Sequence, residues 1–255
     1  MSYYNSNNPI SNKDNCFKEL DALEGQSDSS ISLQSIGLRN KFIQKVYANL
    51  SVMCILTALS CYAFINNNKL QSFSTSDSGK ALIWICLIIL ITTIIITICF
   101  DSIAKVFPYD YGILTIFTIC QSYILGTTCV QYSSNIVVMA GISTIAITLA
   151  LTLFAFQTKY DCTGTGGFLL ASLTGLIVIQ IVNIFVHSSS IQLLAASIGL
   201  IIFSAYIIYD TQMIVGGSHR KYQFSINEHV FATINIYLDI VNLFINLLQL
   251  LDMKD

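Results

Sequence analysis

Two acidic residues lie deep inside apolar segments of the sequence, where a charge is hard to accommodate. Asp210 lies in the segment FSAYIIYDTQMIV, and Asp239 lies in the segment NIYLDIVNLFINLL. A charged residue at the centre of a membrane-spanning helix costs about 2.5 to 3.5 kcal/mol, so such residues usually face a bundle interior or a water-filled cavity. No Lys or Arg lies in either segment. The remaining ways to lower the cost are protonation, a proton shared by the two acids, hydrogen bonds from amides, or a bound cation.

Amide side chains accompany Asp239 at helical spacing. The polar residues of this segment are Asn235, Asp239, Asn242, Asn246 and Gln249. Steps of three and four residues keep side chains on one face of a helix, so these residues form a single polar stripe. Lipid cannot be the partner of that face, which must contact protein, water or ions.

Two interpretations of this stripe remain open. In the structural interpretation it joins neighbouring helices, and the amides cap the carboxyl group of Asp239. In the functional interpretation Asp210 and Asp239 form a proton or ion site, supported by Asn235, Asn242 and Asn246. Two acids without a basic partner suit a cation, and hard cations such as Ca²⁺ prefer oxygen ligands. Asp210 and Asp239 are therefore the candidate calcium site, with calcium as the permeant ion and no cofactor expected.

Other polar residues of the apolar segments have simpler interpretations. We expect interhelix hydrogen bonds from three amides and solvated side chains for three histidines at segment edges or in a loop, namely Gln121, Gln180, Asn183, His187, His219 and His229. Catalytic triads, phosphate-binding loops and clusters of metal ligands are not recognisable in the sequence. We therefore predict that the protein is not an enzyme.

Long apolar segments position these residues. Hydrophobic residues make up 54% of the 255 residues and charged residues only 10%, whereas a soluble domain carries about a quarter charged residues. A membrane-crossing helix needs about 20 apolar residues. Seven windows meet this requirement, at about 46–65, 81–100, 111–131, 135–157, 165–187, 190–215 and 228–251. The sequence thus predicts an all-α integral membrane protein, a bundle of seven transmembrane helices in a lipid bilayer.

The polar N-terminal segment differs in composition from these windows. Residues 1–38 are rich in Ser, Asn and Asp, which predicts a disordered tail, with the membrane domain over residues 39–255. The net charge is −2 and the basic residues do not cluster. This distribution argues against a nucleic-acid partner.

Loop residues indicate how the last two helices are joined. Gly216 and Gly217 are expected to end the sixth helix. Ser225 and Glu228 fit the capping box that opens the seventh. Asp210 lies about 9 Å before Gly216 along a helix, and Asp239 about 21 Å beyond Ser225. The two acids can therefore lie level only if the seventh helix begins outside the membrane.

Basic residues predict the orientation in the membrane. The side of the N-terminus carries Arg39, Lys41, Lys45, Lys105, Lys159, Arg220 and Lys221, and the other side carries Lys69, Lys80 and Lys254. Because cytosolic loops carry an excess of Lys and Arg, the N-terminus is expected in the cytosol. The C-terminus lies on the opposite side if the seventh window spans fully, and both ends are cytosolic if that window is re-entrant.

Four segments resemble a known family. They are IIYDTQMIVGGSHRKYQFSINEHVFATINIYLDIVNLFINLLQLL at 207–251, LRNKFIQKVYANLS at 38–51, FTICQSYILG at 117–126 and FQTKYD at 156–161. Their order and spacing are similar to those of the Bax-inhibitor (transmembrane Bax-inhibitor-motif) family, specifically its Lifeguard branch. The resemblance implies a seven-helix protein of the endoplasmic reticulum, the Golgi or related membranes. It also implies a calcium leak down the gradient and suppression of cell death.

The resemblance further implies a role for the two acids. Asp210 of YDTQ and Asp239 of YLD match the paired aspartates that act in this family as a proton-sensitive latch over the pore. Many relatives have Glu at the position of Gln121, and bacterial members have an acid in the helix that matches 81–100, where this chain has none. Relatives often read SPEEY where this chain reads SINEH, at 225–229. The latch is therefore supported, whereas a further acidic ion site is not.

Two functions from different classes follow. The first is a proton-modulated calcium leak channel of an internal membrane that inhibits cell death. The second is a membrane-anchored binding protein that suppresses cell death by docking protein partners through its tail or loops, without conduction. In the second, Asp210 and Asp239 are only structural, so a protein in which both are Asn should keep its activity if it still folds. A seven-helix receptor is disfavoured, because neither proline of the chain lies inside a window.

Overall fold

The computed structural model describes residues 9–99, 108–217 and 219–253. Every regular element within these residues is a helix. The chain divides into two units, residues 1–41 and residues 42–255. The packing described below is that of the second unit.

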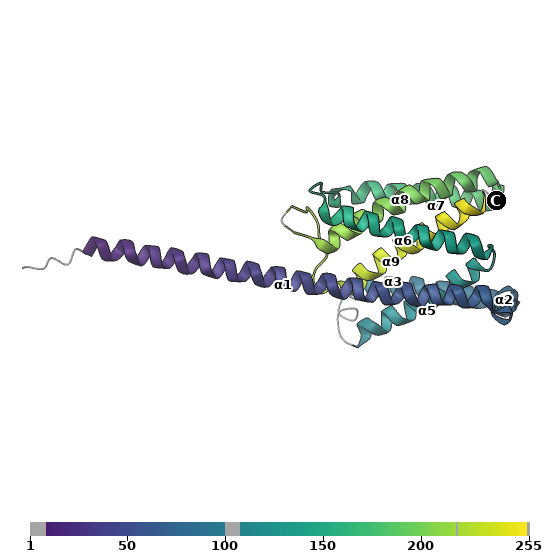
Figure 1. Cartoon of the computed structure of the whole chain (residues 1–255), viewed down its shortest axis with the longest axis horizontal. Coiled ribbons are helices and arrows are strands. Elements are labelled where there is room, and N and C mark those ends of the chain that lie inside the picture. The colour runs from purple at the N-terminus through teal and green to yellow at the C-terminus, as the bar shows by residue number, and fades with distance from the viewer. Residues whose placement is uncertain (1–8, 100–107, 218, 254–255) are drawn as a thin grey trace, which may run out of the picture. The chain divides into compact units, whose positions relative to one another are not determined.

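Figure 1 shows the helices in their order along the chain. In chain order they are α1 (Pro9–Asn66), α2 (Asn68–Thr75), α3 (Asp77–Cys99), α5 (Tyr109–Cys129), α6 (Ser134–Gln157), the 3-10 turn η1 (Thr163–Thr165), α7 (Gly166–Val186), α8 (Ser189–Val215) and α9 (His229–Asp252). Among the described residues, seven segments are long and apolar enough to cross a membrane: Ile36–Asn66, Asp77–Cys99, Tyr109–Cys129, Ser134–Gln157, Thr163–Val186, Ser189–Val215 and His229–Asp252. Each of them overlaps one predicted window, so the predicted seven-helix membrane bundle is confirmed. The last residue of the second window, Phe100, lies outside the described residues.

The predicted division at residue 38 is not decided by these helices. Residues 1–8 of the predicted tail lie outside the described residues, and α1 begins at Pro9 and continues to Asn66. Disorder over 1–38 in solution and a membrane domain over 39–255 therefore stay predictions.

Local sequence explains where several helices begin and end. The side chain of Ser133 accepts a hydrogen bond from the backbone N–H of Ile136 and so caps the start of α6. Gly216 and Gly217 have φ angles of 61° and 113° directly after α8, which confirms that they end the sixth transmembrane helix. The backbone N–H of Ser225 donates to Glu228 Oε2 at 2.9 Å. One bond of the predicted capping box is thus formed, but α9 begins at His229 with Glu228 as its N-cap, so the box does not open the helix at Ser225.

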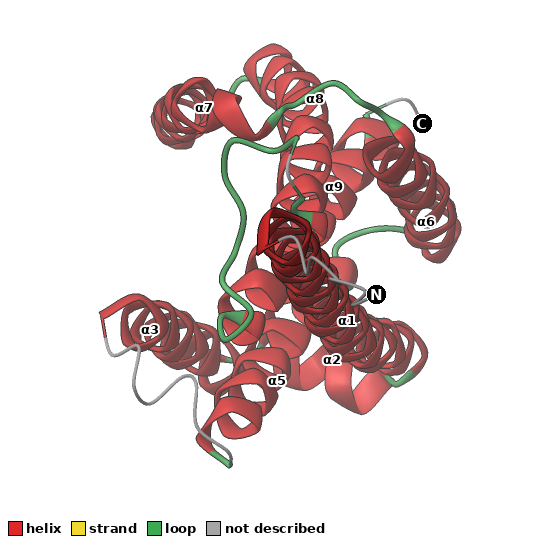
Figure 2. Ribbon diagram, turned by 90° about the vertical axis from the view of Figure 1, so that its left-hand side faces the viewer, coloured by secondary structure: helices red, strands yellow, loops and turns green. Residues whose placement is uncertain are grey.

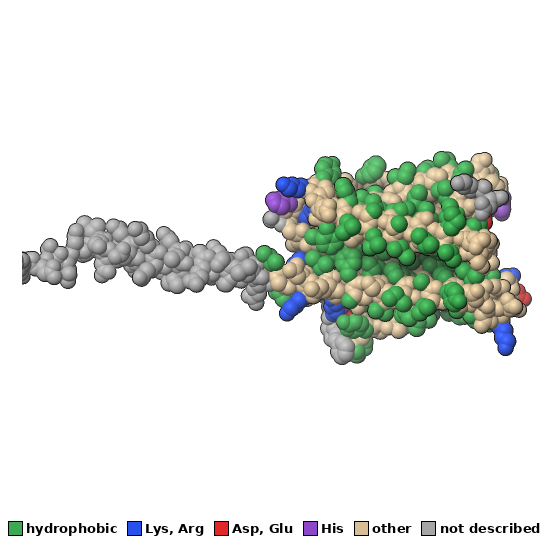
Figure 3. Space-filling view, in the orientation of Figure 1, with side chains coloured by type: hydrophobic (Ala, Val, Ile, Leu, Met, Phe, Trp, Pro, Cys, Tyr) green, Lys and Arg blue, Asp and Glu red, His purple; other side chains and the backbone are tan. Residues whose placement is uncertain are grey.

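The bundle has a protein core and an apolar outer surface. Figure 2 shows α3 and α7 at the periphery and α9 in the interior, where it packs against α8, α6, α5 and α3. Of the apolar window of α9, 61% is buried inside the protein, compared with 11% for α7. Figure 3 shows hydrophobic side chains along the helices, with Lys, Arg, Asp and Glu gathered at the ends of the bundle. This distribution suits a protein that lipid surrounds between two charged ends.

Candidate functional site

The structure brings together the two predicted acids, on the two most closely associated helices. Asp210 is the sixth residue from the end of α8, and Asp239 lies near the middle of α9. Both are buried, with 5% and 7% of their surface exposed. Their carboxyl groups are in side-chain hydrogen-bond contact with one another. The two acids are therefore level in the bundle, as a joint site requires.

A contact between two carboxyl groups has a chemical consequence. An ionised carboxylate can only accept hydrogen bonds, so one of the two must carry a proton for a bond to form. Asp239 Oδ2 is buried and has no hydrogen-bond partner among the described residues. Buried polar atoms are normally satisfied, and an exception calls for an explanation such as a water or an ion. The pair thus has one proton-sharing contact and one open acceptor position.

Hydroxyl groups lie next to this pair. Tyr206 of α8 is close enough to interact electrostatically with both Asp210 and Asp239. Thr211 is fully buried and accepts a hydrogen bond from the hydroxyl of Tyr47, in α1, at 3.5 Å. These contacts place α1 beside α8 at the level of the two acids.

Two amides of the polar stripe, Asn242 and Asn246, bond to the backbone of their own helix. The amide nitrogens of Asn242 and Asn246 donate to the carbonyl oxygens of Leu238 and Asn242, at 2.8 and 2.7 Å. Asn246 also packs directly against Gly199 of α8, where an added Cβ would collide with its side chain. Asn235 is half-buried. These amides therefore bond to the backbone of α9 or pack at the α8–α9 contact, and the described bonds do not cap Asp239.

The other predicted polar residues have mixed outcomes. Gln121 is buried in α5, whereas Gln180 is exposed on α7. Asn183 Oδ1 accepts a hydrogen bond from the backbone N–H of Ser188 at 3.1 Å, which is a local cap and not an interhelix bond. The predicted exposure of His187 and His219 is confirmed.

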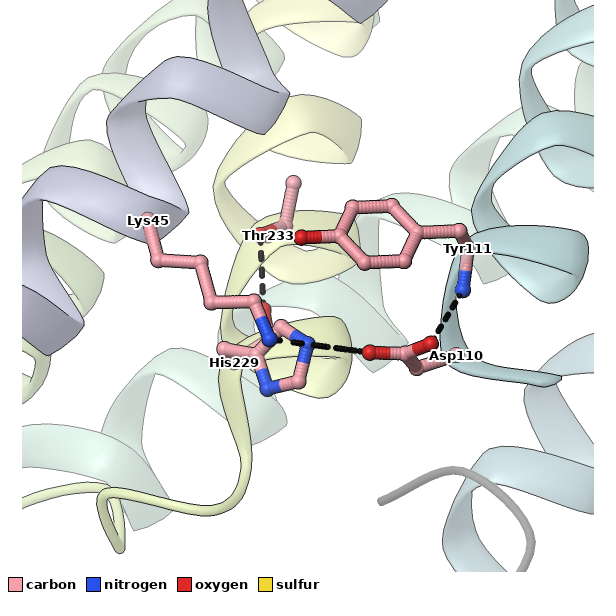
Figure 4. Close-up of polar contacts among 5 residues, drawn as sticks. All are labelled: Lys45, Asp110, Tyr111, His229 and Thr233. Carbon is pink, nitrogen blue, oxygen red and sulfur yellow. Dashed lines mark hydrogen bonds and ion pairs between the residues drawn. The ribbon is translucent and has the colours of Figure 1, made fainter. Parts of the chain in front are cut away.

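The expectation that His229 is solvated is wrong, because this side chain is buried in an ionic cluster (Figure 4). Its Nε2 lies 3.2 Å from Asp110 Oδ2, and Lys45 Nζ lies 3.5 Å from the same oxygen. Asp110 is 2% exposed and accepts a hydrogen bond at its other oxygen from the N–H of Tyr111. The Lys45–Asp110–His229 cluster joins α1, α5 and α9.

The cluster continues into a second polar face of α9 that sequence reasoning missed. Thr233 donates to the carbonyl oxygen of His229, and the Tyr237 hydroxyl lies 2.7 Å from Thr57 Oγ1. Thr57 Oγ1 in turn lies 3.0 Å from Ser122 Oγ. The spacing of four residues between His229, Thr233 and Tyr237 was the available signal, since it places them along one face.

A network of hydrogen bonds also joins the α6–α7 connection to the α8–α9 connection. Arg220 donates to the carbonyl oxygens of Tyr160, Thr158 and Ala155, at 2.6, 2.9 and 3.3 Å. Cations favour the carbonyl end of a helix, and Ala155 and its neighbours end α6. The Gln212 side chain accepts from the N–H of Cys162 and donates to the carbonyl oxygen of Tyr160. The residue two positions after Asp210 is thereby tied to the connection after α6.

Asp161 holds the two connections together. Its Oδ1 accepts hydrogen bonds from the hydroxyl and the N–H of Thr163, and its Oδ2 accepts one from the N–H of Lys221. The hydrogen bond from the Thr163 hydroxyl, with help from these N–H groups and from the charge of Arg220, lowers the pKa of Asp161 below its usual value. The charged form of Asp161 is therefore the one that fits this connection.

Among the described residues, the pair Asp210–Asp239 has carboxyl oxygens that a cation could contact. Its oxygens are of the type that Ca²⁺ prefers, but Ca²⁺ usually takes six to eight oxygen ligands. Within the described residues no group of three or more His, Cys, Asp or Glu could hold a metal ion. Asp210 and Asp239 thus suit brief contact with a passing ion better than a resident one, and the predicted calcium site stays a prediction.

Together, these features define a class of protein: an all-α bundle of seven transmembrane helices with a buried pair of acids between two of them. The chain belongs to the family described as inhibitor of apoptosis-promoting Bax1, whose match covers residues 39–255.

Several relatives show the same relationship over most of the chain. Protein lifeguard 3 of Mus musculus is 30% identical over 223 residues, 86% of this chain and 71% of that protein. The Golgi anti-apoptotic protein of Vaccinia virus (strain Lister) is 30% identical over 236 residues, 89% of this chain and 91% of that protein. Protein LIFEGUARD 4 of Arabidopsis thaliana is 30% identical over 222 residues, 86% of this chain and 87% of that protein. The resemblance to the Bax-inhibitor family and its Lifeguard branch is confirmed.

Proposed function

We propose that this chain is a pH-modulated calcium leak channel of an internal membrane, and that it inhibits cell death. The cell-death role is supported by the description of the family, inhibitor of apoptosis-promoting Bax1, and by the name of the viral relative, Golgi anti-apoptotic protein. That name also supports a Golgi or related membrane, with the endoplasmic reticulum as the other candidate. In this proposal the protein is no enzyme, needs no cofactor, and carries calcium as cargo.

One observation supports the leak above all others, the contact between Asp210 and Asp239. Two acids buried at membrane depth are costly and usually mark a path for ions or protons. Among the described residues, neither forms an ion pair with a basic side chain. A proton shared between them, or a cation passing them, compensates their charge in place of a Lys or Arg.

The mechanism follows from the charge on the pair. A single shared proton gives a charge-assisted hydrogen bond, which is the strong kind, and holds α8 against α9. Loss of that proton leaves two like charges in a medium of low dielectric constant, which favours separation of the helices or capture of a cation. A second proton removes the charge assistance. Flux should therefore change as the pH crosses the value at which the shared proton is gained or lost.

The orientation of the bundle is part of the proposal. We place the N-terminus in the cytosol, because the basic residues on its side of the predicted bundle outnumber those on the other side. Arg220 and Lys221, between α8 and α9, then lie in the cytosol as well.

Purified protein in liposomes that contain a trapped calcium dye tests the leak directly. We expect calcium flux that depends on the protein and varies with pH near neutrality. Absence of protein-dependent flux over a range of pH would remove the leak from the proposal. In that case a second assay applies, in which the protein with both Asp210→Asn and Asp239→Asn is expressed in cells. Protection from cell death that persists in this folded variant would favour the binding protein and its protein partners.

A further inference from the structure

The Lys45–Asp110–His229 cluster places two possible cations on one carboxylate oxygen. We propose that Asp110 exchanges its counter-ion, from Lys45 of α1 to His229 of α9, when the imidazole of His229 gains a proton. The end of the bundle where α1, α5 and α9 meet is then a proton-driven switch. It is separate from the pair Asp210–Asp239 and does not depend on calcium conduction.

The geometry gives the two side chains the same target. Lys45 Nζ and His229 Nε2 lie 3.5 and 3.2 Å from Asp110 Oδ2. The other oxygen, Oδ1, is occupied by the N–H of Tyr111 at 2.8 Å. Figure 4 shows both nitrogens converging on the carboxylate from α1 and α9. In the structure the two cations therefore share one acceptor atom of Asp110.

The charges of the cluster decide how Lys45 and His229 share Asp110 Oδ2. With a neutral imidazole, Lys45 and Asp110 compensate one another, and Nε2–H serves as a neutral donor. A proton on His229 adds a second positive charge, while the cluster still has only one negative charge. Only 6% of the His229 side chain and 3% of the Asp110 side chain are exposed. An uncompensated charge at such a buried place is unfavourable, so either one cation moves away from Asp110 or His229 stays neutral.

Lys45 is the cation that can leave. Its side chain is 39% exposed, and its ammonium group sits on a flexible four-carbon stem. Its Nζ also lies 5.3 Å from the centre of the Tyr111 ring, which offers a second, weaker site. His229 is the first residue of α9 and is fixed by a helix that packs in the interior. Protonation therefore transfers the ion pair from α1–α5 to α5–α9.

The groups that act on the imidazole are few. Lys45 from α1 and Asp110 from α5 act on it electrostatically, and the backbone of Asn227 forms a hydrogen bond with it. Among the described residues, no charged group of α3, α6 or α8 acts on it. The imidazolium ion can donate from both ring nitrogens. The site has a partner for each donor, at Asp110 and at Asn227.

Nuclear magnetic resonance of the full chain in lipid nanodiscs tests the exchange. The chain contains three histidines, so ¹⁵N-histidine labelling gives three imidazole titrations, and His229→Gln assigns the one of interest. We expect Lys45→Met to move the His229 midpoint to higher pH by about one unit, the ordinary spread of histidines in folded proteins. Lys45→Arg keeps the charge and should leave the midpoint in place. His187 and His219 are exposed and serve as internal references that should not move.

A second label follows the lysine in the same samples. With ¹⁵N-lysine, the Lys45 ammonium signal, assigned through Lys45→Arg, should change its shift at the His229 midpoint as it leaves Asp110. A His229 midpoint that is the same in the wild type and in Lys45→Met overturns the proposal. A Lys45 signal that does not change at that midpoint overturns it as well. Both readouts use Lys45, which is partly exposed, so they do not require the buried Asp110 to be replaced.

Discussion

Tyr237 and Asp239 lie two positions apart on α9 and serve opposite sides of it. The Tyr237 hydroxyl contacts Thr57 of α1, and the Asp239 carboxyl group contacts Asp210 of α8. Two residues turn an α-helix by about 200°, so a segment with polar groups at both positions is polar on two faces. The last transmembrane helix is therefore held from both sides by polar contacts, with apolar residues between them.

Replacement of either acid of the pair should flatten the pH profile of calcium flux. Asp210→Asn and Asp239→Asn each remove the shared proton, because an amide does not titrate. The double variant should then differ little from either single variant, since residues in direct contact are typically coupled by about 0.5 to 3 kcal/mol. The measurement is dye-reported flux in liposomes over a range of pH. Asp77→Asn, at an exposed acid in the first turn of α3, is the control. Additive single effects would show that the two acids are not a coupled latch.

The hydroxyl cluster between α1, α5 and α9 should contribute to stability. Tyr237→Phe leaves the ring in place and removes the hydroxyl that contacts Thr57, with a loss of about 1 kcal/mol. Thermal denaturation in detergent measures the change. Tyr62→Phe is the matched control, because the Tyr62 side chain is on the same helix as Thr57 and is 68% exposed. Equal stability of the two variants would contradict a role for the cluster.

The close approach of α8 and α9 depends on the absence of a side chain at Gly199. Gly199→Ala places a methyl group where the Asn246 amide lies, so we expect a lower thermal stability and a wider α8–α9 spacing. Gly175→Ala, on α7, is the control, because a Cβ there meets nothing within 4 Å. Asn246→Ala combined with Gly199→Ala should restore part of the loss. A stable Gly199→Ala variant would mean that Asn246 can take another rotamer.

The contact between the α6–α7 and α8–α9 connections should loosen in acid. Because the folded state lowers the pKa of Asp161 from its ordinary value of 3.8, its contribution is present above that value and is lost as the pH falls through the lower one. Hydrogen exchange at the amides of Thr163 and Lys221, which bond to this carboxylate, reports the change. In Asp161→Asn the acid-dependent change at both amides should disappear. The same change in wild type and variant would assign it to another group.

Labelling from one side of the membrane tests the proposed orientation. A cysteine introduced at His219, which is exposed between α8 and α9, should react with an impermeant reagent once the plasma membrane alone is permeabilised. Cys16, Cys54, Cys99 and Cys162 are replaced by Ser beforehand, and the remaining cysteines are buried. A cysteine introduced at Lys69 is the control and should react only when the organelle membrane is also opened. The reverse pattern would place the N-terminus in the lumen.

Hydropathy predicted the seven helices because each must match the thickness of the same membrane. The acid pair could also be anticipated, since Asp210 and Asp239 interrupt segments that otherwise carry no charge. His229 could not be placed, because a histidine at the edge of a window is solvated or buried according to what faces it. Its partner Asp110 comes from a helix more than a hundred positions earlier in the chain. Pairing at such a distance depends on how the helices pack, which periodicity within one helix does not describe.

The uneven burial of the spans bears on how the protein is made. The apolar windows of α5 and α9 are 56% and 61% buried and have mean hydropathies of 1.3 and 1.6, whereas that of α3 is 22% buried with a value of 3.0. A span with low hydropathy gains little from lipid alone and depends on protein neighbours for its place in the membrane. Translation delivers α9 after α5, α6 and α8 have left the ribosome. The helix α9, which is poorly suited to insert by itself, is thus synthesised when the partners that surround it are already available.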